Sequence, residues 1–194
     1  MTAETVTTYP KHTITALVED KPGVLNRVVS MFRRRGYNIA SLAVGQSEVA
    51  GLSRMTFVVE GDDEIVEQVT KHMNKLTDVI KVQDISDANT VERELALIRV
   101  GAGPQARSEI MQIVDIFRAH IVDVAADSII VEVTGNQNKV VSLENLLKPF
   151  GITEVMRIGT IAMNRGEGSV KTDDLRPRER LSPDRSTWID KSGG

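Results

Sequence analysis

One pattern occurs twice in this chain of 194 residues, and an internal repeat restricts a chain to folds built from two similar units. A shift of 85 positions carries the apolar positions of a predicted helix from Leu25 and Phe32 onto Ile110 and Phe117. A shift of 74 positions carries Gly61 and the apolar residues that follow it onto Gly135 and the apolar residues that follow that glycine. The second shift is smaller because the turn between the two middle strands is shorter in the second copy. We therefore expect two tandem units of about 75 residues.

The first copy predicts the order strand, helix, strand, strand, helix, strand. Alternating β-branched residues indicate its strands, and apolar residues three and four apart indicate its helices. Pro22 is typical of the first turn of a helix and Gly36 of a helix end. Leu25, Val28, Val29 and Phe32 are predicted to form the apolar face of the first helix. The expected strands lie at 12–18, 37–46, 53–60 and 79–85, and the second helix starts at 61–63 with Ile65, Val66, Val69 and Met73 inward.

The second copy repeats this order. Pro104 is expected to open its first helix, and its second helix is expected at 136–148. The predicted strands lie at 93–101, 121–125, 128–133 and 154–162, and Ile110, Ile113, Val114 and Phe117 are predicted to face inward.

The order of elements predicts an α+β fold made of two tandem ferredoxin-like βαββαβ units. We expect a leader at 1–11, the first unit at 12–86, the second at 91–165 and a charged tail at 166–194. The tail has few large apolar residues, so we expect it to be disordered or to order on a partner.

Composition excludes several kinds of site. The absence of Cys excludes thiolate zinc sites and cysteine nucleophiles, and a net charge of −3 gives no basic excess for nucleic acid or anionic lipid. The three His residues are far apart in sequence, and the glycines at 101 and 103 lack the spacing of a phosphate-binding loop. No apolar run reaches the roughly 18 residues of a membrane span. We expect no metal site, no membrane and a cytoplasmic location.

The segment at 20–25 joins the first strand to the first helix and has the chemistry to bind an amino acid. Amide groups at a helix start favour an anion such as a carboxylate, and Gly23 lets a ligand approach the backbone closely. Asp20 supplies a negative charge suited to an ammonium group. The same residues also make an ordinary strand–helix turn, and these physical arguments leave both interpretations open.

The D-x-P-G-x-L element from Asp20 to Leu25, within a βαββαβ unit, resembles the ACT domain, a small-molecule-sensing module. The longer run at 20–27, with 34–39, 41–44 and 52–56, resembles the regulatory (small) subunit of acetolactate synthase. This resemblance covers about residues 10 to 165.

The resemblance implies a non-catalytic partner of a large catalytic subunit, with thiamine diphosphate and Mg on that partner and no cofactor on this chain. It implies a role in branched-chain amino acid biosynthesis, activation of the partner, and feedback inhibition by valine, often with leucine or isoleucine. It also implies a homodimer of ACT domains with the effector at their interface. Carried over by position, the effector site takes Asp20, Gly23, Val24 and Leu25 from one protomer and Asn38 and Ile39 from the other.

Two departures and three alternatives accompany this interpretation. Many family members have Asn where Asp20 stands, and the second unit has a Gly101–Ala102–Gly103–Pro104–Gln105 loop in place of the D-x-P-G element. The second unit is therefore expected to serve dimerisation or assembly, not a second identical site. The main alternative is a stand-alone amino-acid-sensing ACT protein that regulates another enzyme. A transcriptional regulator would need a helix-turn-helix, and an enzyme in its own right would need a catalytic group.

Overall fold

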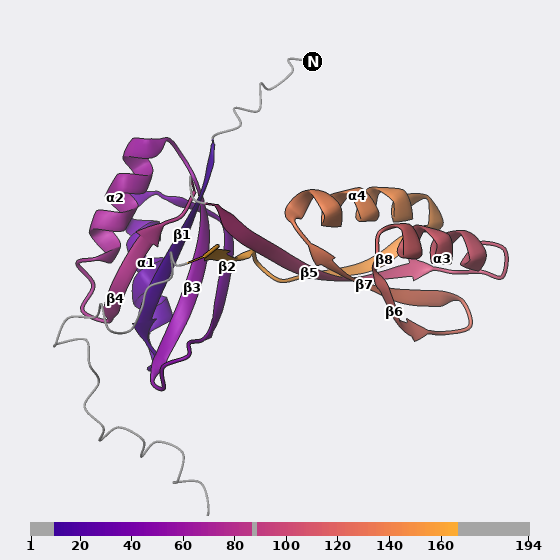
Figure 1. Ribbon diagram of the computed structural model, residues 1–194, viewed down its shortest axis with the longest axis horizontal. Helices are drawn as coiled ribbons and strands as arrows, with labels where there is room; N and C mark the ends of the chain where they lie inside the picture. The colour runs from indigo at the N-terminus through magenta and orange to yellow at the C-terminus, as the bar shows by residue number, and fades with distance from the viewer. Residues whose placement is uncertain (1–9, 87–88, 167–194) are drawn as a thin grey trace, which may run out of the picture. The chain divides into compact units, whose positions relative to one another are not determined.

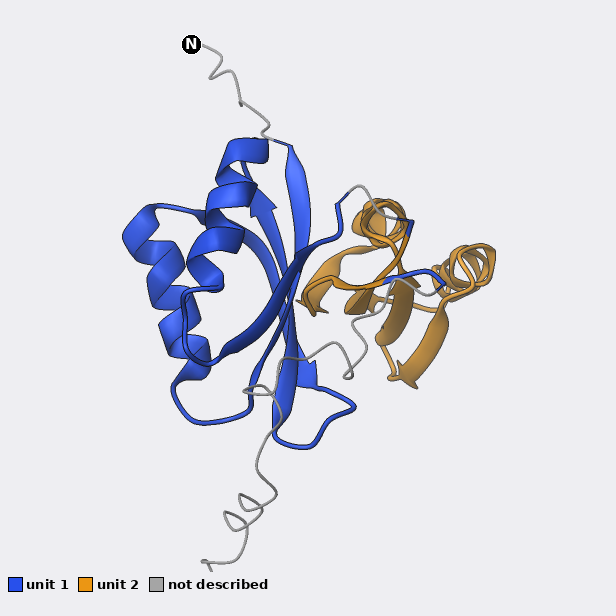
Figure 2. Ribbon diagram, turned by 60° about the vertical axis from the view of Figure 1, so that its left-hand side comes forward, with its two compact units in different colours: residues 1–89, 164–194 blue, residues 90–163 orange. Residues whose placement is uncertain are grey.

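The structure is a computed structural model that describes residues 10–86 and 89–166 (Figure 1). These residues form two compact units, the first from residues up to 89 together with 164–166 and the second from 90–163 (Figure 2). Most of the predicted leader and tail lies outside the described residues. The domain limits at 12–86 and 91–165 stay predictions. Each unit is an antiparallel sheet with two helices packed on one face, which confirms the predicted fold class.

The first unit has the strand order β2-β3-β1-β4. β1 pairs antiparallel with β3 on one side and with β4 on the other, and β2 is an edge strand of this sheet. Helix α1 packs near β2 and helix α2 near β4. The elements are β1 (Lys11–Glu19), α1 (Val24–Arg35), β2 (Asn38–Gln46), β3 (Leu52–Glu60), α2 (Asp63–Met73) and β4 (Val79–Asp84).

The core of the first unit lies between the sheet and its helices. Phe32 of α1 stacks on Phe57 of β3 with ring centroids 5.3 Å apart. The predicted apolar face of α1 is partly wrong, because Leu25 and Val29 are exposed. The buried face of α1 consists of Val24, Val28, Met31 and Phe32.

The second unit has the strand order β6-β7-β5-β8, and β9 also pairs with the long strand β5. The residues after Pro104 form a turn, so α3 begins at Arg107 and the predicted start at Pro104 is wrong. Ile110 and Val114 are buried as predicted, and Ile113 and Phe117 are partly buried against the same core. The elements are β5 (Thr90–Gly101), α3 (Arg107–Ile116), β6 (His120–Val124), β7 (Ser128–Gly135), α4 (Gln137–Leu147), the short η1 (Lys148–Phe150), β8 (Ile152–Arg157) and β9 (Ile161–Asn164).

The single strand predicted at 154–162 is two strands, β8 and β9. The break falls around Gly159, and the next residue, Thr160, donates its hydroxyl to the buried carboxylate of Glu94 over 2.8 Å. Arg157 at the end of β8 donates to the other oxygen of Glu94 over 2.6 Å. The chain therefore bends around a buried acid, and a straight strand cannot do so.

The repeat is visible at equivalent helix starts. The side chain of Asp62 accepts from the Ile65 amide over 2.9 Å before α2, and Asn136 accepts from the Lys139 amide over 3.0 Å before α4. The glycine before each cap has no room for a side chain. A Cβ on Gly61 would lie 2.8 Å from Ile65, and one on Gly135 would lie 2.5 Å from Lys139. Both copies thus build this corner in the same way.

Candidate functional site

Gly23 shapes the loop between β1 and α1. It is the N-cap of α1 and has φ 88°, a left-handed conformation that favours glycine over residues with a Cβ. Pro22 precedes this cap, so it does not occupy the first turn of the helix as predicted. The chain turns sharply at Gly23, where the Val24 amide donates to the Lys21 carbonyl over 3.4 Å and the flanking residues Gly23 and Leu25 are exposed.

The start of α1 lacks the side-chain cap that the start of α2 has. The first amides of a helix lack intrahelical acceptors, and α2 satisfies one of them with Asp62. Within the described residues, no side chain caps α1, and its first turn has no acidic residue. The positive end of its dipole is therefore left for an anion from outside the helix.

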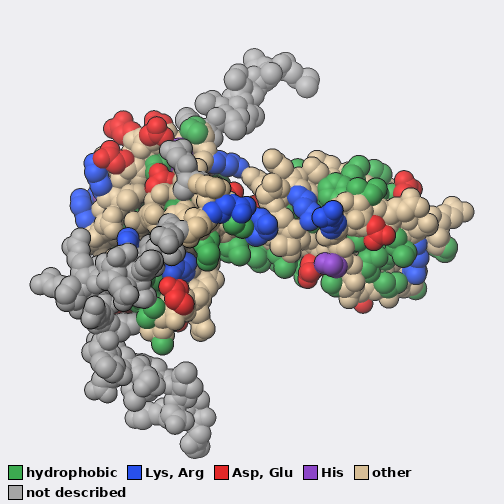
Figure 3. All heavy atoms as spheres, in the orientation of Figure 1, with side chains coloured by type: hydrophobic (Ala, Val, Ile, Leu, Met, Phe, Trp, Pro, Cys, Tyr) green, Lys and Arg blue, Asp and Glu red, His purple; other side chains and the backbone are tan. Residues whose placement is uncertain are grey.

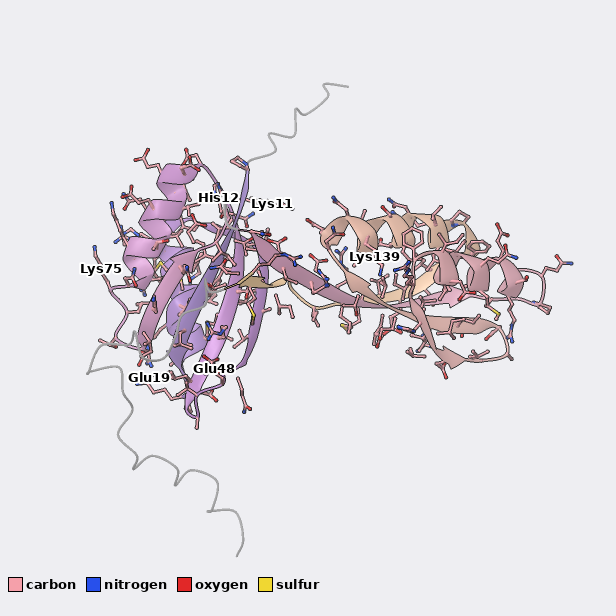
Figure 4. All side chains as sticks on the ribbon, in the orientation of Figure 1. Lys11, His12, Glu19, Glu48, Lys75 and Lys139 are labelled. Atoms are coloured by element: carbon pink, nitrogen blue, oxygen red, sulfur yellow. The ribbon has the colours of Figure 1, made fainter. Side chains whose placement is uncertain are left out.

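Backbone hydrogen bonds attach this loop to its neighbours. The Asp20 amide donates to the Gly51 carbonyl in the β2–β3 turn over 2.8 Å, and the Glu19 amide donates to the Asp78 carbonyl before β4 over 2.9 Å. Figure 4 shows Glu19 and Glu48 near the same end of the first sheet. The loop and the β2–β3 turn thus share one end of the unit.

A buried carboxylate lies behind the loop. The side chain of Asp78 is 6% exposed, with Oδ1 2.6 Å from the Lys21 ammonium and Oδ2 2.5 Å from Nε of Arg27. Lys21 also pairs with Glu19. These contacts lower the pKa of Asp78, mainly through Lys21, and raise the pKa of Lys21, mainly through Asp78. Sequence reasoning missed Asp78, because it lies in a short turn without a motif, 51 positions from Arg27.

The predicted site residues on this loop differ in their exposure to solvent. Asp20 and Gly23 are exposed, and the Leu25 side chain is 44% exposed. The Val24 side chain is 2% exposed and packs in the core. The Val24 amide donates to the Lys21 carbonyl over 3.4 Å, so Val24 lines the loop from within the core, whereas Leu25 can offer a ligand an apolar side chain.

Asn38 and Ile39 lie at the first positions of β2. The whole of α1 separates them from Gly23, and its 12 residues span about 18 Å. Asn38 is exposed and donates to Glu60, whereas Ile39 packs partly against the core. One chain therefore brings Asp20, Gly23, Val24 and Leu25 together but leaves Asn38 and Ile39 at the far end of the helix.

The edge of the first sheet at β2 is uncharged and flanked by exposed apolar side chains. The β2 sequence, NIASLAVGQ, contains no charged residue, whereas the opposite edge strand β4 contains Lys81 and Asp84. Val44 on β2 and Leu25 and Val29 on the neighbouring helix are each more than a third exposed. Natural edge strands usually carry charge that blocks pairing, so this edge is typical of one that pairs with another strand.

The equivalent loop of the second unit is organised differently. Arg107 at the start of α3 donates through Nε to the Ala102 carbonyl over 3.0 Å and through Nη2 to the carbonyls of Ala125 and Ala126. A guanidinium thus ties this loop to the β6–β7 turn. The Ala102 amide donates to the Asp127 carbonyl over 2.8 Å, which repeats the Asp20–Gly51 bond of the first unit.

Other site chemistry is sparse in the described parts of the chain. Residues 10–86 and 89–166 hold no group of three or more His, Cys, Asp or Glu side chains able to bind a metal ion. None of the described helices has the length and apolar character needed to span a bilayer. Figure 3 shows hydrophobic side chains at the surface of both units.

The chain matches known protein families over most of its length. Residues 14–81 match the family described as the AHAS small subunit-like ACT domain. Residues 93–166 match the family described as the small subunit of acetolactate synthase. The first matched segment lies within the first unit, and the second covers most of the second unit and continues to residue 166.

Relatives that match over most of their own length are alike in sequence and in structure. The probable acetolactate synthase small subunit of Archaeoglobus fulgidus is 58% identical over 156 residues, which cover 80% of this chain and 98% of that protein. The acetolactate synthase small subunit of Bacillus subtilis is 52% identical, over 80% of this chain and 91% of that protein. The crystal structure of the acetolactate synthase small subunit from Thermotoga maritima matches with a TM-score of 0.76 and 44% identity, over 81% of this chain and 98% of that one.

Proposed function

Because the chain belongs to the family of acetolactate synthase small subunits, we propose that it raises the activity of an acetolactate synthase catalytic subunit and confers feedback inhibition by valine. The chain itself is non-catalytic in this proposal. Thiamine diphosphate and Mg, bound on the catalytic partner, supply the carbon–carbon bond chemistry. The pathway is branched-chain amino acid biosynthesis, and we place the chain in the cytoplasm with its partner.

The open start of α1 is the observation that carries the proposal. The amides of Gly23 and Leu25, on either side of the bonded Val24 amide, can hold the carboxylate of an amino acid, where the helix dipole favours negative charge. The exposed side chain of Leu25 offers apolar contact to a branched side chain. Asp20 beside the loop supplies an acceptor for the ammonium group. A zwitterionic, branched amino acid matches all of these features.

A dimer through β2 would complete the site. β2 ends at Gln46, paired with Ser53 near the β2–β3 turn, and that turn is bonded to the β1–α1 loop through Gly51 and Asp20. When two β2 strands pair antiparallel about a two-fold axis, the start of each lies beside the end of the other. Asn38 and Ile39 of a second protomer would then lie beside the loop of the first. The uncharged edge of β2 supports this arrangement.

Regulation follows from linkage in this proposal. Valine binds one arrangement of the paired first units more tightly, and the active catalytic subunit prefers the other. A coupling free energy of about 1–3 kcal/mol is enough for substantial inhibition. Reciprocity requires that the active form of the holoenzyme bind valine more weakly than the inhibited form does.

Co-purification with the catalytic subunit tests the proposal against the stand-alone sensor. The tagged chain should retain an acetolactate synthase large subunit from the same organism on an affinity column, and the isolated chain should show negligible turnover of pyruvate with thiamine diphosphate and Mg²⁺. Failure to retain the large subunit would favour a sensor of another enzyme. Robust turnover by the isolated chain would contradict its non-catalytic role.

A further inference from the structure

We propose that Asp78 is a positioning residue for the amino-acid effector, because it holds the β1–α1 loop and Arg27 in the arrangement that binds the effector carboxylate. This inference rests on the proposed function, since it concerns the same site. Asp78 itself lies behind the loop, between α2 and β4, and acts through residues that border the helix start.

Asp78 bonds to residues on both sides of Gly23 in the β1–α1 loop. Its backbone carbonyl accepts from the Glu19 amide over 2.9 Å, before the loop. Its two carboxylate oxygens separately engage Lys21, which precedes Gly23, and Arg27, which follows it. A glycine with a left-handed φ provides little stiffness of its own, because it lacks a Cβ. Together with the Asp20–Gly51 bond, this common attachment therefore sets the shape of the loop.

Asp78 also directs the guanidinium of Arg27. Its Oδ2 lies 2.5 Å from Nε, which fixes one edge of the planar group and leaves Nη1 on another side. A Cβ built on Gly23 would lie 3.6 Å from that Nη1, so the guanidinium lies close to Gly23. A positive charge held at this point adds to the helix dipole beside the amides proposed to bind the carboxylate.

A residue that only supports the fold would behave differently from a positioning residue. Loss of a supporting residue lowers the free energy of unfolding but leaves ligand affinity unchanged at temperatures where the protein is folded. Loss of a positioning residue lowers the affinity itself, because the binding groups are no longer preorganised. The two roles are separable by measuring both quantities on the same variants.

The experiment is titration calorimetry of the full chain with valine, leucine and isoleucine. Asp78→Asn keeps the size of the side chain and removes its charge. We expect it to weaken binding of the preferred amino acid about tenfold, by analogy with the loss of a residue that orients a metal ligand. The matched control is Glu67→Gln, which removes the acid of the exposed Glu67–Lys71 pair on α2 and should leave affinity unchanged. Amide exchange at residues 23–25 should become faster in Asp78→Asn only.

The outcomes separate this inference from the proposed function. A wild-type chain that binds none of the three amino acids would overturn the proposed function and this inference with it. Wild-type binding with unchanged affinity in Asp78→Asn would overturn the positioning role alone. If Asp78→Asn does not fold, Arg27→Met carries the test, because that side chain is 48% exposed. Unchanged affinity in Arg27→Met would then overturn the inference. If both variants fold, their effects on binding should be less than additive, because Asp78 acts partly through Arg27.

Discussion

The side-chain amide of Asn38 donates a hydrogen bond to Oε2 of Glu60 over 2.6 Å, between the neighbouring strands β2 and β3. An ionised carboxylate only accepts hydrogen bonds, so the NH₂ group of Asn38 must face Glu60. The carbonyl oxygen of the same amide then faces away and is available to accept from an ammonium group. Glu60 also places a negative charge close to that acceptor.

Glu60→Val is expected to weaken binding of the amino-acid effector. The variant frees the amide of Asn38 to rotate and removes the nearby negative charge. An exposed hydrogen bond contributes up to about 1 kcal/mol, so we expect a loss of about two- to fivefold in affinity by calorimetry. Glu60→Gln can still accept from Asn38 and should lose less. Equal affinity in wild type and Glu60→Val would show that Asn38 needs no such orientation.

Gly23→Asp is expected to abolish inhibition by valine while activation of the catalytic subunit remains. An aspartate at the N-cap places its own carboxylate on the amides of α1, where it competes with the effector carboxylate. The left-handed φ of 88° adds a strain of about 1–2 kcal/mol. Gly23→Ala carries a similar strain without the charge and should keep most of the inhibition. Wild-type inhibition of the holoenzyme containing Gly23→Asp would refute the assignment of the site to this loop.

Val44→Lys is expected to convert the proposed dimer into a monomer that no longer binds valine. A lysine on an edge strand opposes pairing, and Val44 is 48% exposed on the uncharged edge β2. Light scattering reports the mass, and calorimetry reports the affinity. Gln83→Lys, on the opposite edge strand β4, is the control and should leave both unchanged. A Val44→Lys chain that stays dimeric and binds valine would exclude pairing through β2.

The stability of the first unit is expected to rise with pH up to about 6.5, because of His72. Its Nδ1 lies 3.1 Å from the Tyr37 hydroxyl, and partial burial, followed by the charges of Arg35 and Lys75, lowers its pKa. At a pH below the ordinary pKa of histidine, His72 therefore takes up a proton in the unfolded chain but less readily in the folded chain. The free energy of unfolding consequently falls as the pH falls. Urea unfolding at pH 5.5 and 7.5 should show this difference, and His72→Gln should reduce it. If the difference in unfolding free energy between the two pH values is the same in His72→Gln as in the wild type, another titrating group causes it.

Much of the fold could be predicted because local patterns agree with each other in both copies. The turns before α2 and α4 have the same construction. Gly61 leaves room for the side chain of Ile65, and Gly135 leaves room for the side chain of Lys139. Gly36 ends α1 with φ 71°, as its position after three arginines predicts. These features depend on neighbours in sequence, and so a pattern of residues records them.

The predictions from sequence are wrong where contacts between residues far apart in the chain determine the local structure. Helix α1 has apolar residues at more positions than one face can hold, and packing against the sheet selected Met31 instead of Leu25 and Val29. The break between β8 and β9 depends on Thr160 reaching the buried Glu94, 66 positions earlier. Asp78 meets Arg27, and Glu60 meets Asn38, only once the chain has folded. Periodicity contains no information about such long-range contacts.

The rate of acetolactate formation by the catalytic subunit, measured with and without this chain and with and without valine, tests the central claim most directly. We expect the chain to raise the rate and valine to lower it only when the chain is present. A catalytic subunit whose rate and valine sensitivity are the same with and without the chain would contradict the proposed regulatory function.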